Sequence, residues 1–598
     1  GGYGCYLLAN NFNKNYLSSI IAGIIFTFTT YHMAHSLVHI GLSMIVWLPI
    51  FVLFLFKLLE KQSKYYSIVG GIIFFLVSLT HLYYSVFITM FSIVFFAVYI
   101  FKQKKVSNKT FITNFSILLT IGLISASILF LSNTTLGDGA PDRLLDEHIK
   151  YSISLENLIL PGPEHTTQKI SDHGMYKSFY SFFDKPVHGL QIEHFSFLGY
   201  SVIFLSALAV IRYRRNHIWF WLLICGIFVL MSLGPELKIF HESTGIVLPD
   251  KIFYDVVPEW DEIRAPARFI VMANLALAVL ASYAVYGLLK NKFSPFKQQL
   301  MLTAVIGFVI LFEFSMIPYL SYSEPIPDIY EEIKNDESKF TVLPAPIGGT
   351  GDGLLLSAPV MLYHQIHHEK PIYGGFESRV DIEIMRNTQT YFLNMFHILG
   401  SKDDVIKQDL VTHGLSLFDH FDIKYITLHK KLASYDKINQ NTLSLKFLPE
   451  TRQHMSEILG GDKPIYEDNQ IIVYKIPKSD SLEPFLLLGS GWYIFESEHN
   501  GRAAMTSSEI MIVNPTNSEM NVTLNLVLSS IKNENVMTVF MNNEKLASYD
   551  IPTEPTYTQI ENLTLKPGIN TVTLENDKFV LVGKTKVSLK VESISITN

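Results

Sequence analysis

The sequence contains few cysteines and few charged residues for its length. Its 598 residues include two cysteines, Cys5 and Cys225, and both lie in or beside apolar runs. Two isolated thiols exclude a disulfide framework of the kind that stabilises small secreted domains. Charged residues make up 17% of the chain and the net charge is −7, which excludes the basic surface of a typical nucleic-acid-binding protein. We therefore expect no nucleic acid among its partners.

No signal peptide is visible at the start of the sequence. The chain begins with Gly1 rather than methionine, and no charged segment followed by a short apolar core indicates a signal peptide. Internal repeats and low-complexity tracts are not evident. We therefore expect the sequence to be a fragment whose natural N-terminus lies upstream of Gly1.

Apolar and aromatic residues are abundant. Hydrophobic residues make up 49% of the chain, with 43 Phe and 30 Tyr. Apolar runs that approach or reach the length needed to cross ~30 Å of hydrocarbon recur up to residue 320. They cover residues 16–28, 44–58, 67–79, 86–100, 111–131, 197–211, 219–233, 267–289 and 301–320. This pattern predicts a polytopic α-helical membrane bundle in residues 1–320, with about nine membrane segments.

Lysine and arginine are concentrated on alternate connections between these runs. Basic clusters follow the second, fourth, sixth and eighth runs, at residues 57–64, 102–109, 212–215 and 290–297. Basic connections stay in the cytoplasm, so the intervening connections, which are richer in acids, histidines and aromatics, face outside. We predict a multi-pass protein of the cell membrane whose C-terminal domains and working face are extracytoplasmic.

One stretch, residues 258–269, places charged side chains directly before the apolar run at 267–289. Pro266 suits the first turn of a helix, so Arg264 and Arg268 stand at a helix N-terminus, where the backbone dipole is already positive. Two cations there need an anion. The acids of the same stretch are Glu259, Asp261 and Glu262. Either these acids form an internal ion-pair network with the arginines, or a phosphate group binds there from outside.

Three histidines, His32, His35 and His39, follow the first run at i, i+3 and i+7 and share one helix face. Imidazoles are metal ligands, so a divalent cation is the cofactor this pattern suggests. However, i to i+7 spans two helical turns, too far for all three rings to reach one ion. We therefore assign no metal site, and the alternative is a set of interfacial residues that hydrogen-bond to lipid headgroups. His81 is a further residue at this rim.

The long external connection after residue 131 carries more candidates. Carboxylates such as Asp142 act as general bases or hold divalent cations in other sites, and His165 follows in the same connection. The alternative for each of them is an ordinary solvated face.

The sequence pattern changes after residue 320. Residues 321–336 are rich in proline and acids and form a linker, and alternating helices and strands then predict a small extracytoplasmic α/β domain in residues 337–480. Within it, residues 348–353 are glycine-rich but lack the dinucleotide-binding spacing. His364 and His368 stand at i and i+4, either as a metal pair or as part of a solvent-facing polar stripe.

Residues 481–598 contain short β-prone runs separated by turn signals. The expected strands cover residues 508–513, 521–528, 536–541, 556–560, 571–574 and 587–596. They predict an extracytoplasmic β-sandwich, and residues 536–546 and 565–574 resemble carbohydrate-binding jelly-roll modules. The aromatic residues Trp492, Tyr493 and Phe495 either stack on a sugar or form a buried cluster at the domain junction.

Two segments of the membrane half resemble a known class. The run from Ser19 to Tyr31, followed by His35, His39 and Trp47-Leu-Pro, resembles the third-helix region of large polytopic glycosyltransferases of the GT-C class. The motif Arg264-Ala-Pro-Ala-Arg-Phe resembles one in poorly characterised membrane proteins of that type. The resemblance implies a polyprenyl-phosphate-linked sugar donor on the extracytoplasmic side. It also implies a catalytic Asp in a first external loop, which lies upstream of Gly1, so no residue is assigned to that role.

Our leading hypothesis is a membrane glycosyltransferase-like protein that transfers a sugar from such a donor to a carbohydrate or glycoprotein acceptor. Arg264 and Arg268 are the candidates for binding the donor phosphate. The Trp-Trp-Asp-Tyr-Gly motif of oligosaccharyltransferases is absent, which argues against that activity. One alternative is a non-catalytic membrane scaffold that displays a glycan-binding sandwich. Another is a lipid or polysaccharide transporter, with Glu313 as its charged residue inside the membrane.

Overall fold

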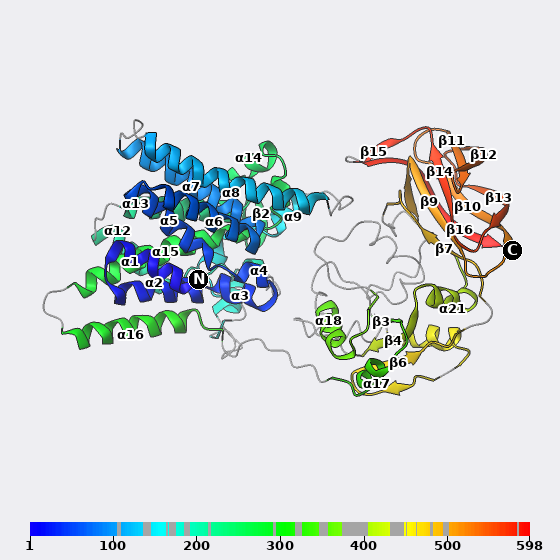
Figure 1. The fold of residues 1–598 in the computed structure, drawn as a ribbon, viewed down its shortest axis with the longest axis horizontal. Coiled ribbons are helices and arrows are strands. Elements are labelled where there is room, and N and C mark those ends of the chain that lie inside the picture. The colour runs from blue at the N-terminus through cyan, green and yellow to red at the C-terminus, as the bar shows by residue number, and fades with distance from the viewer. Residues whose placement is uncertain are drawn as a thin grey trace. The chain divides into compact units, whose positions relative to one another are not determined.

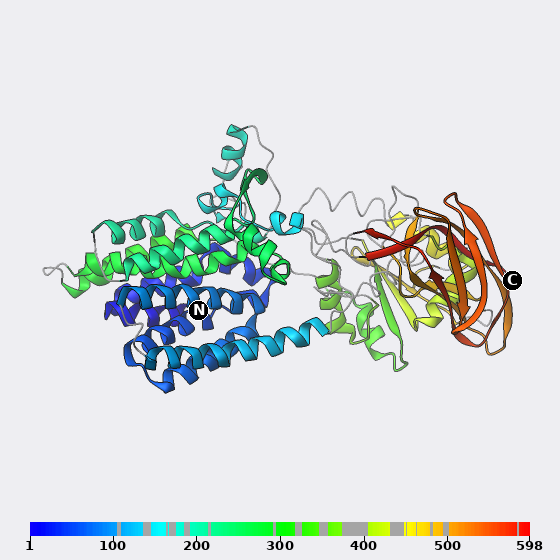
Figure 2. The same cartoon turned by 90° about the horizontal axis from the view of Figure 1, so that it is seen from above.

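The computed structural model divides the chain into two compact units, and the boundary between them in the sequence lies between residues 322 and 323 (Figures 1 and 2). It describes residues 1–103, 109–135, 145–162, 165–166, 175–183, 192–212, 217–290, 295–316, 326–345, 357–373, 405–430, 448–449, 451–461, 463–478, 482–493, 501–582 and 585–597. Asp142, the glycine-rich run at 348–353 and Phe495 lie outside these residues.

The first unit is a helical bundle built around α15 (Ile270–Leu289). This helix has no charged residue, and nearly all of its side chains are buried, as expected for a helix that is apolar on every face. Its neighbours are α1 (Gly2–Asn13), α2 (Tyr16–Phe28), α12 (Tyr200–Arg212) and α13 (Ile218–Ser232). The stretch at 258–269 therefore leads directly into the centre of the bundle.

The remaining long helices pack around this centre (Figure 2). They are α5 (Trp47–Lys61), α6 (Lys64–Thr80), α7 (Leu82–Gln103), α8 (Lys109–Thr135) and α16 (Phe296–Glu313). Each of the nine predicted apolar runs coincides largely with a helix, whereas α1 was not predicted. Among the described residues, four helices are long and apolar enough to cross a membrane, or five if α2 and α3 (Thr30–Val38), bent by 47°, form one span.

Glu313 lies at the C-terminal end of α16 rather than in the middle of a span. Its carboxylate accepts hydrogen bonds from the backbone N–H groups of Tyr200 and Ser201 and from the Ser201 hydroxyl. A carboxylate in this position satisfies the open N–H groups at the start of α12 and complements the helix dipole. This role leaves the transporter alternative without its charged candidate.

Short elements close one end of the bundle. They include α9 (Leu145–Lys150), η1 (Leu155–Leu158), η2 (Ile192–His194), α14 (Pro249–Val256), η3 (Trp260–Glu262), η4 (Pro266–Phe269) and the hairpin of β1 (Glu236–Ile239) with β2 (Glu242–Val247). Pro266 occupies the first turn of η4, which runs directly into α15. Trp260 is fixed here because its indole N–H donates to the buried Asp250 carboxylate at 3.0 Å.

The second unit contains a small α/β sheet and a β-sandwich. The sheet has the order β3-β4-β6-β5, from strands Thr341–Ala345, Ile423–His429, Ile471–Lys475 and Tyr466–Glu467. Strands β3 and β4 are parallel, while β5 and β6 form an antiparallel hairpin. The helices α17 (Ile329–Asn335), α18 (Ser357–His368) and α21 (Leu410–His420) belong to the same part.

The β-sandwich consists of two five-stranded sheets. One contains β8 (Arg502–Met505), β10 (Met520–Ser530), β13 (Thr556–Leu565), β15 (Val580–Val582) and β16 (Thr585–Thr597). The other has the order β12-β11-β14-β9-β7, from Glu544–Ile551, Asn535–Met541, Gly568–Asn576, Ser507–Asn514 and Phe485–Leu488. Alternating residues of both sheets fill one apolar core. Asn542 and Asn543 turn β11 into β12 with φ angles of 48° and 72°, as a two-residue hairpin requires.

Candidate functional site

A buried ion pair occupies the closed end of the helical bundle. Arg268, on η4, donates from Nε to both carboxylate oxygens of Glu193 at 3.1 and 3.2 Å, and its Nη2 also donates to Glu193. The two side chains are only 11% and 8% exposed. The guanidinium lies over the ring of Tyr83, 4.8 Å from its centroid. Arg268 is therefore held by a bidentate carboxylate and an aromatic face, both of which suit its planar charge.

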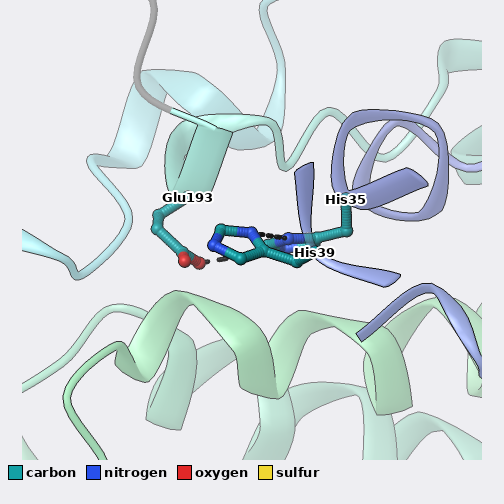
Figure 3. A group of neighbouring side chains, drawn as sticks. All are labelled: His35, His39 and Glu193. Carbon is teal, nitrogen blue, oxygen red and sulfur yellow. Dashed lines mark hydrogen bonds and ion pairs between the residues drawn. The ribbon is translucent and has the colours of Figure 1, made fainter. Parts of the chain in front are cut away.

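Two histidines meet the same carboxylate (Figure 3). His35 lies on α3, and His39 is the residue directly after that helix. Their Nδ1 atoms lie 3.1 Å apart. His35 Nε2 lies 3.7 Å from the Oε2 atom of Glu193. The three side chains point toward one another and offer one ligand atom each within a mutual 4.8 Å. His35 and His39 stand at i and i+4, and the His39 N–H still donates to the His35 carbonyl oxygen at 2.8 Å, so the last turn of α3 places the two rings side by side.

The charges of this group are set by burial and by Arg268. Burial raises the pKa of Glu193, but the adjacent guanidinium and the histidines outweigh it and lower that pKa to about 2. Burial also lowers the pKa of His39, and burial together with Arg268 lowers the pKa of His81 to about 4. At neutral pH the site therefore holds one carboxylate, one guanidinium and neutral imidazoles, whose lone pairs are available for bonding.

Arg264 has a different environment from Arg268. Its Nε lies 2.6 Å from a carboxylate oxygen of Glu147 on α9, and its side chain is 40% exposed. It also donates to the Tyr151 hydroxyl at 3.0 Å and lies over the Tyr151 ring. Both arginines thus pair with an acid that lies far from them in sequence. The two arginines do not form one symmetrical phosphate clamp.

The acids of the stretch itself occupy other places. Glu259 is exposed and adopts a left-handed backbone conformation with φ 59°, and Glu262 is partly buried. The side chain of Asp261 lies outside the described part of the structure. The pairs that the structure describes for the two arginines are with Glu193 and Glu147, outside this stretch.

The other predicted residues are dispersed. The ring nitrogens of His32 contact the carbonyl oxygens of Thr27 and Ser43, so its role is to join neighbouring backbone segments rather than to complete the group around Glu193. His165 contacts the carbonyl oxygen of Glu313. His81 lies between α6 and α7, close enough to His39 and Arg268 for their charges to affect its titration.

Glu193 was not predicted as a site residue. It is one acid in a long polar connection, with no motif around it. The only local signal is its position beside Ile192 and Phe195, because a carboxylate flanked by apolar residues is often buried and paired.

The second unit corrects one interpretation and decides between two alternatives for Trp492. His364 and His368 are 1% and 2% exposed, so they do not form a solvent-facing stripe. Trp492 is fully buried, and its indole N–H donates to the Glu509 carbonyl at 2.6 Å. It therefore offers no face on which a sugar can stack.

Comparisons with known proteins identify a family for the first part of the chain. A protein-family model described as a domain of unknown function (DUF6311) matches residues 1–311, just over half of the chain. No curated protein matches the chain.

Solved structures similar to part of the chain include carbohydrate-binding modules. A family 35 carbohydrate-binding module from an environmental isolate is 19% identical, with 18% of this chain and 74% of that chain covered and a TM-score of 0.13. CBM35 from Cellvibrio japonicus Abf62 is 15% identical, with 19% and 94% covered and a TM-score of 0.16. Xyl-CBM35 in complex with a glucuronic acid-containing disaccharide is 18% identical, with 18% and 75% covered and a TM-score of 0.13. These TM-scores are too low to carry an argument about function.

Proposed function

Since the chain belongs to the DUF6311 family, whose description names no activity, we propose a function from the site itself: a membrane-embedded glycosyltransferase-like protein that uses a polyprenyl-phosphate-linked sugar. The observation that carries this proposal is the convergence of Arg268, Glu193, His35 and His39 at one end of an apolar helix bundle. Such a donor has an apolar chain and a charged headgroup, and this end of the bundle presents both kinds of surface.

The site has the groups that sugar transfer needs. In the reaction, the bond between the sugar C1 and the phosphate oxygen breaks, and the phosphate keeps the electron pair. The acceptor hydroxyl oxygen forms the new bond to C1, and its proton passes to a base. Arginines stabilise the charge that develops on the departing phosphate, and the partly exposed Arg264 is the one best placed to meet it.

A non-catalytic glycan-binding scaffold is the second candidate. The observation that favours it is an exposed patch on the sandwich, where the Tyr557 side chain is 59% exposed and its hydroxyl donates to Asn525 at 2.8 Å. Gln559 donates to the same Asn525 oxygen at 3.0 Å. An aromatic ring beside fixed amides is the combination that sugars pack against. In the transferase hypothesis, the same patch holds the acceptor glycan.

The decisive experiment is sugar transfer by the full chain in lipid nanodiscs. The donors are synthetic polyprenyl phosphates that carry radiolabelled hexoses, and the variants are Arg264→Gln and, as a matched control, Arg452→Gln. Arg452 is 41% exposed and pairs with Glu467 at 3.0 Å, so it resembles Arg264 in exposure but lies in the other unit. We expect the Arg264 variant to lose tenfold or more in transfer rate and the control to keep it.

Two results speak against the transferase. One is unchanged transfer in the Arg264 variant, which removes the proposed phosphate contact. The other is a wild-type chain that binds glycans, loses this binding on Tyr557→Ala and transfers none of the labelled sugars. The second pattern supports the scaffold.

A further inference from the structure

We propose that His35, His39 and Glu193 form a binding site for a divalent transition-metal ion of the zinc class. Among the described residues, they are the one group of three histidine, cysteine or acidic side chains whose ligand atoms lie within 4.8 Å of one another. This proposal goes beyond the proposed function, because it rests on ligand geometry and not on the identity of any substrate.

The distance between the imidazoles is the distance between two ligands of one ion. Metal–nitrogen bonds of about 2.0–2.1 Å place two nitrogens about 2.8–3.0 Å apart at octahedral angles and about 3.3–3.4 Å apart at tetrahedral angles, and the Nδ1 atoms of His35 and His39 are 3.1 Å apart. Without a metal, one ring donates its Nδ1–H to the lone pair of the other. With both Nδ1 atoms deprotonated, the same separation lets both lone pairs bind one ion.

The donor set determines the class of metal. Two imidazoles with one carboxylate bind zinc, iron and related ions, whereas calcium and magnesium prefer oxygen ligands alone. Three protein ligands leave a position open for water or a substrate oxygen.

Arg268 positions the carboxylate ligand. It donates to Glu193 through Nε and Nη2, while the Oε2 atom also faces His35. Such hydrogen bonds from a neighbouring shell fix a ligand's orientation. The guanidinium and the carboxylate cancel in charge, so a bound divalent ion gives the buried site a charge of about +2, which an anion must offset. A phosphate oxygen at the open position supplies that charge.

The test is Co²⁺ binding by the full, metal-free chain in lipid nanodiscs, followed by visible absorption spectroscopy. We expect one equivalent to bind to the wild type, with d–d bands of nitrogen and oxygen ligation. His39→Ala is the first variant, because His39 is only partly buried and its loss leaves the Arg268–Glu193 pair in place. His32→Gln is the matched control, since it lies on the same helix outside the group.

The expected result is at least a tenfold loss of Co²⁺ affinity for His39→Ala and none for His32→Gln, with both variants matching the wild type in circular dichroism and gel filtration. Glu193→Gln keeps the shape of the side chain and removes the carboxylate ligand, so we expect it to lower the Co²⁺ affinity as well. The proposal is overturned if the wild type shows no Co²⁺ bands at saturating excess, or if His39→Ala binds as tightly as the wild type. No sugar donor enters this measurement, so it succeeds or fails separately from the transfer assay.

Discussion

Arg264 and Arg268 stand four residues apart in different surroundings. Arg268 is 11% exposed and bound to a carboxylate that is 8% exposed, whereas Arg264 is 40% exposed and Glu147 is 32% exposed. Removal of one partner from a buried pair leaves an uncompensated charge, which costs about 3–5 kcal/mol. We therefore expect Glu193→Gln to lower the free energy of unfolding by about 3 kcal/mol or more, measured by urea unfolding in detergent.

The exposed pair provides the comparison. Water screens the charges of Arg264 and Glu147, so Glu147→Gln should cost about 1 kcal/mol or less. Equal losses in the two variants would contradict the claim that burial makes Arg268 depend on its partner. They would also remove the reason for treating Glu193 as a residue held in one orientation.

Buried histidines make the stability of the second unit depend on pH. His364 and His429 stack with ring centroids 5.2 Å apart, and the Tyr330 hydroxyl lies 3.1 Å from His364 Nδ1. Burial lowers the pKa of His364 and of His368 to about 4 and that of His429 to about 3. Unfolded histidines titrate near pH ~6.5, so the unfolded chain takes up protons first as the pH falls. Stability should therefore decrease below about pH 6.5 and level off near pH 3–4.

The size of this effect is testable at pH 5, where carboxylates with ordinary or lowered pKa values stay mostly ionised. We expect each of the three histidines to cost of the order of 1–2 kcal/mol at that pH relative to pH 7.5. Pulse proteolysis in urea, with cleavage read in residues 423–475, measures it. His429→Asn should flatten the pH dependence, whereas His454→Asn, at a side chain that is 34% exposed, should not. A profile that is flat in the wild type contradicts the assignment.

At the scale of elements, glycines allow α6 and α8 to approach closely. A Cβ atom on Gly71 would lie 2.7 Å from the Ile121 Cβ and 3.2 Å from the Leu118 carbonyl oxygen, so backbone as well as side chain must move. Gly226 on α13 has no atom within 4 Å of the same position. We expect Gly71→Ala to destabilise the bundle by about 1–3 kcal/mol through overpacking. Gly226→Ala should be neutral or stabilise it by up to about 1 kcal/mol.

Thermal unfolding of the two variants in the same detergent makes this comparison. Because both substitutions add one methyl group to a glycine inside an apolar helix, their difference isolates the contact between α6 and α8. Equal unfolding temperatures would show that α8 shifts without cost.

The same elements show how far sequence reasoning reaches. The spacing of apolar residues along the sequence located the nine apolar helices and the main strands. This works because burial of one face, or of all faces as in α15, determines which nearby positions are apolar. The sequence also located Arg268, His35 and His39, since they lie beside those helices. It missed Glu193, because this residue lies more than a hundred positions from His35 in the sequence and comes close to it only in the folded chain. It also excluded an ion shared by His32, His35 and His39; in the structure His32 contacts backbone carbonyls, and Glu193 is the residue that joins the i, i+4 pair of His35 and His39.

At the scale of the whole molecule, the charge pattern predicts that the basic connections lie on the cytoplasmic side of the membrane and the others on the outer side. Labelling of introduced cysteines tests it, because the chain has few thiols of its own: Cys5 is buried and Cys225 is partly buried. In a Cys225→Ala background, the labelling signal comes from the introduced cysteine. Suitable sites are Lys64 at the start of α6, Glu242 on β2 and Lys545 on β12, all of them exposed.

Basic connections are retained in the cytoplasm, so a membrane-impermeant maleimide added to intact cells should label Glu242→Cys and Lys545→Cys. Lys64→Cys should react only after permeabilisation. This order follows from the charge pattern alone and does not depend on how the two units are placed. If Glu242→Cys is reached only after permeabilisation, the loops near Arg268 face the cytosol, and a donor presented on the outer surface cannot be their substrate.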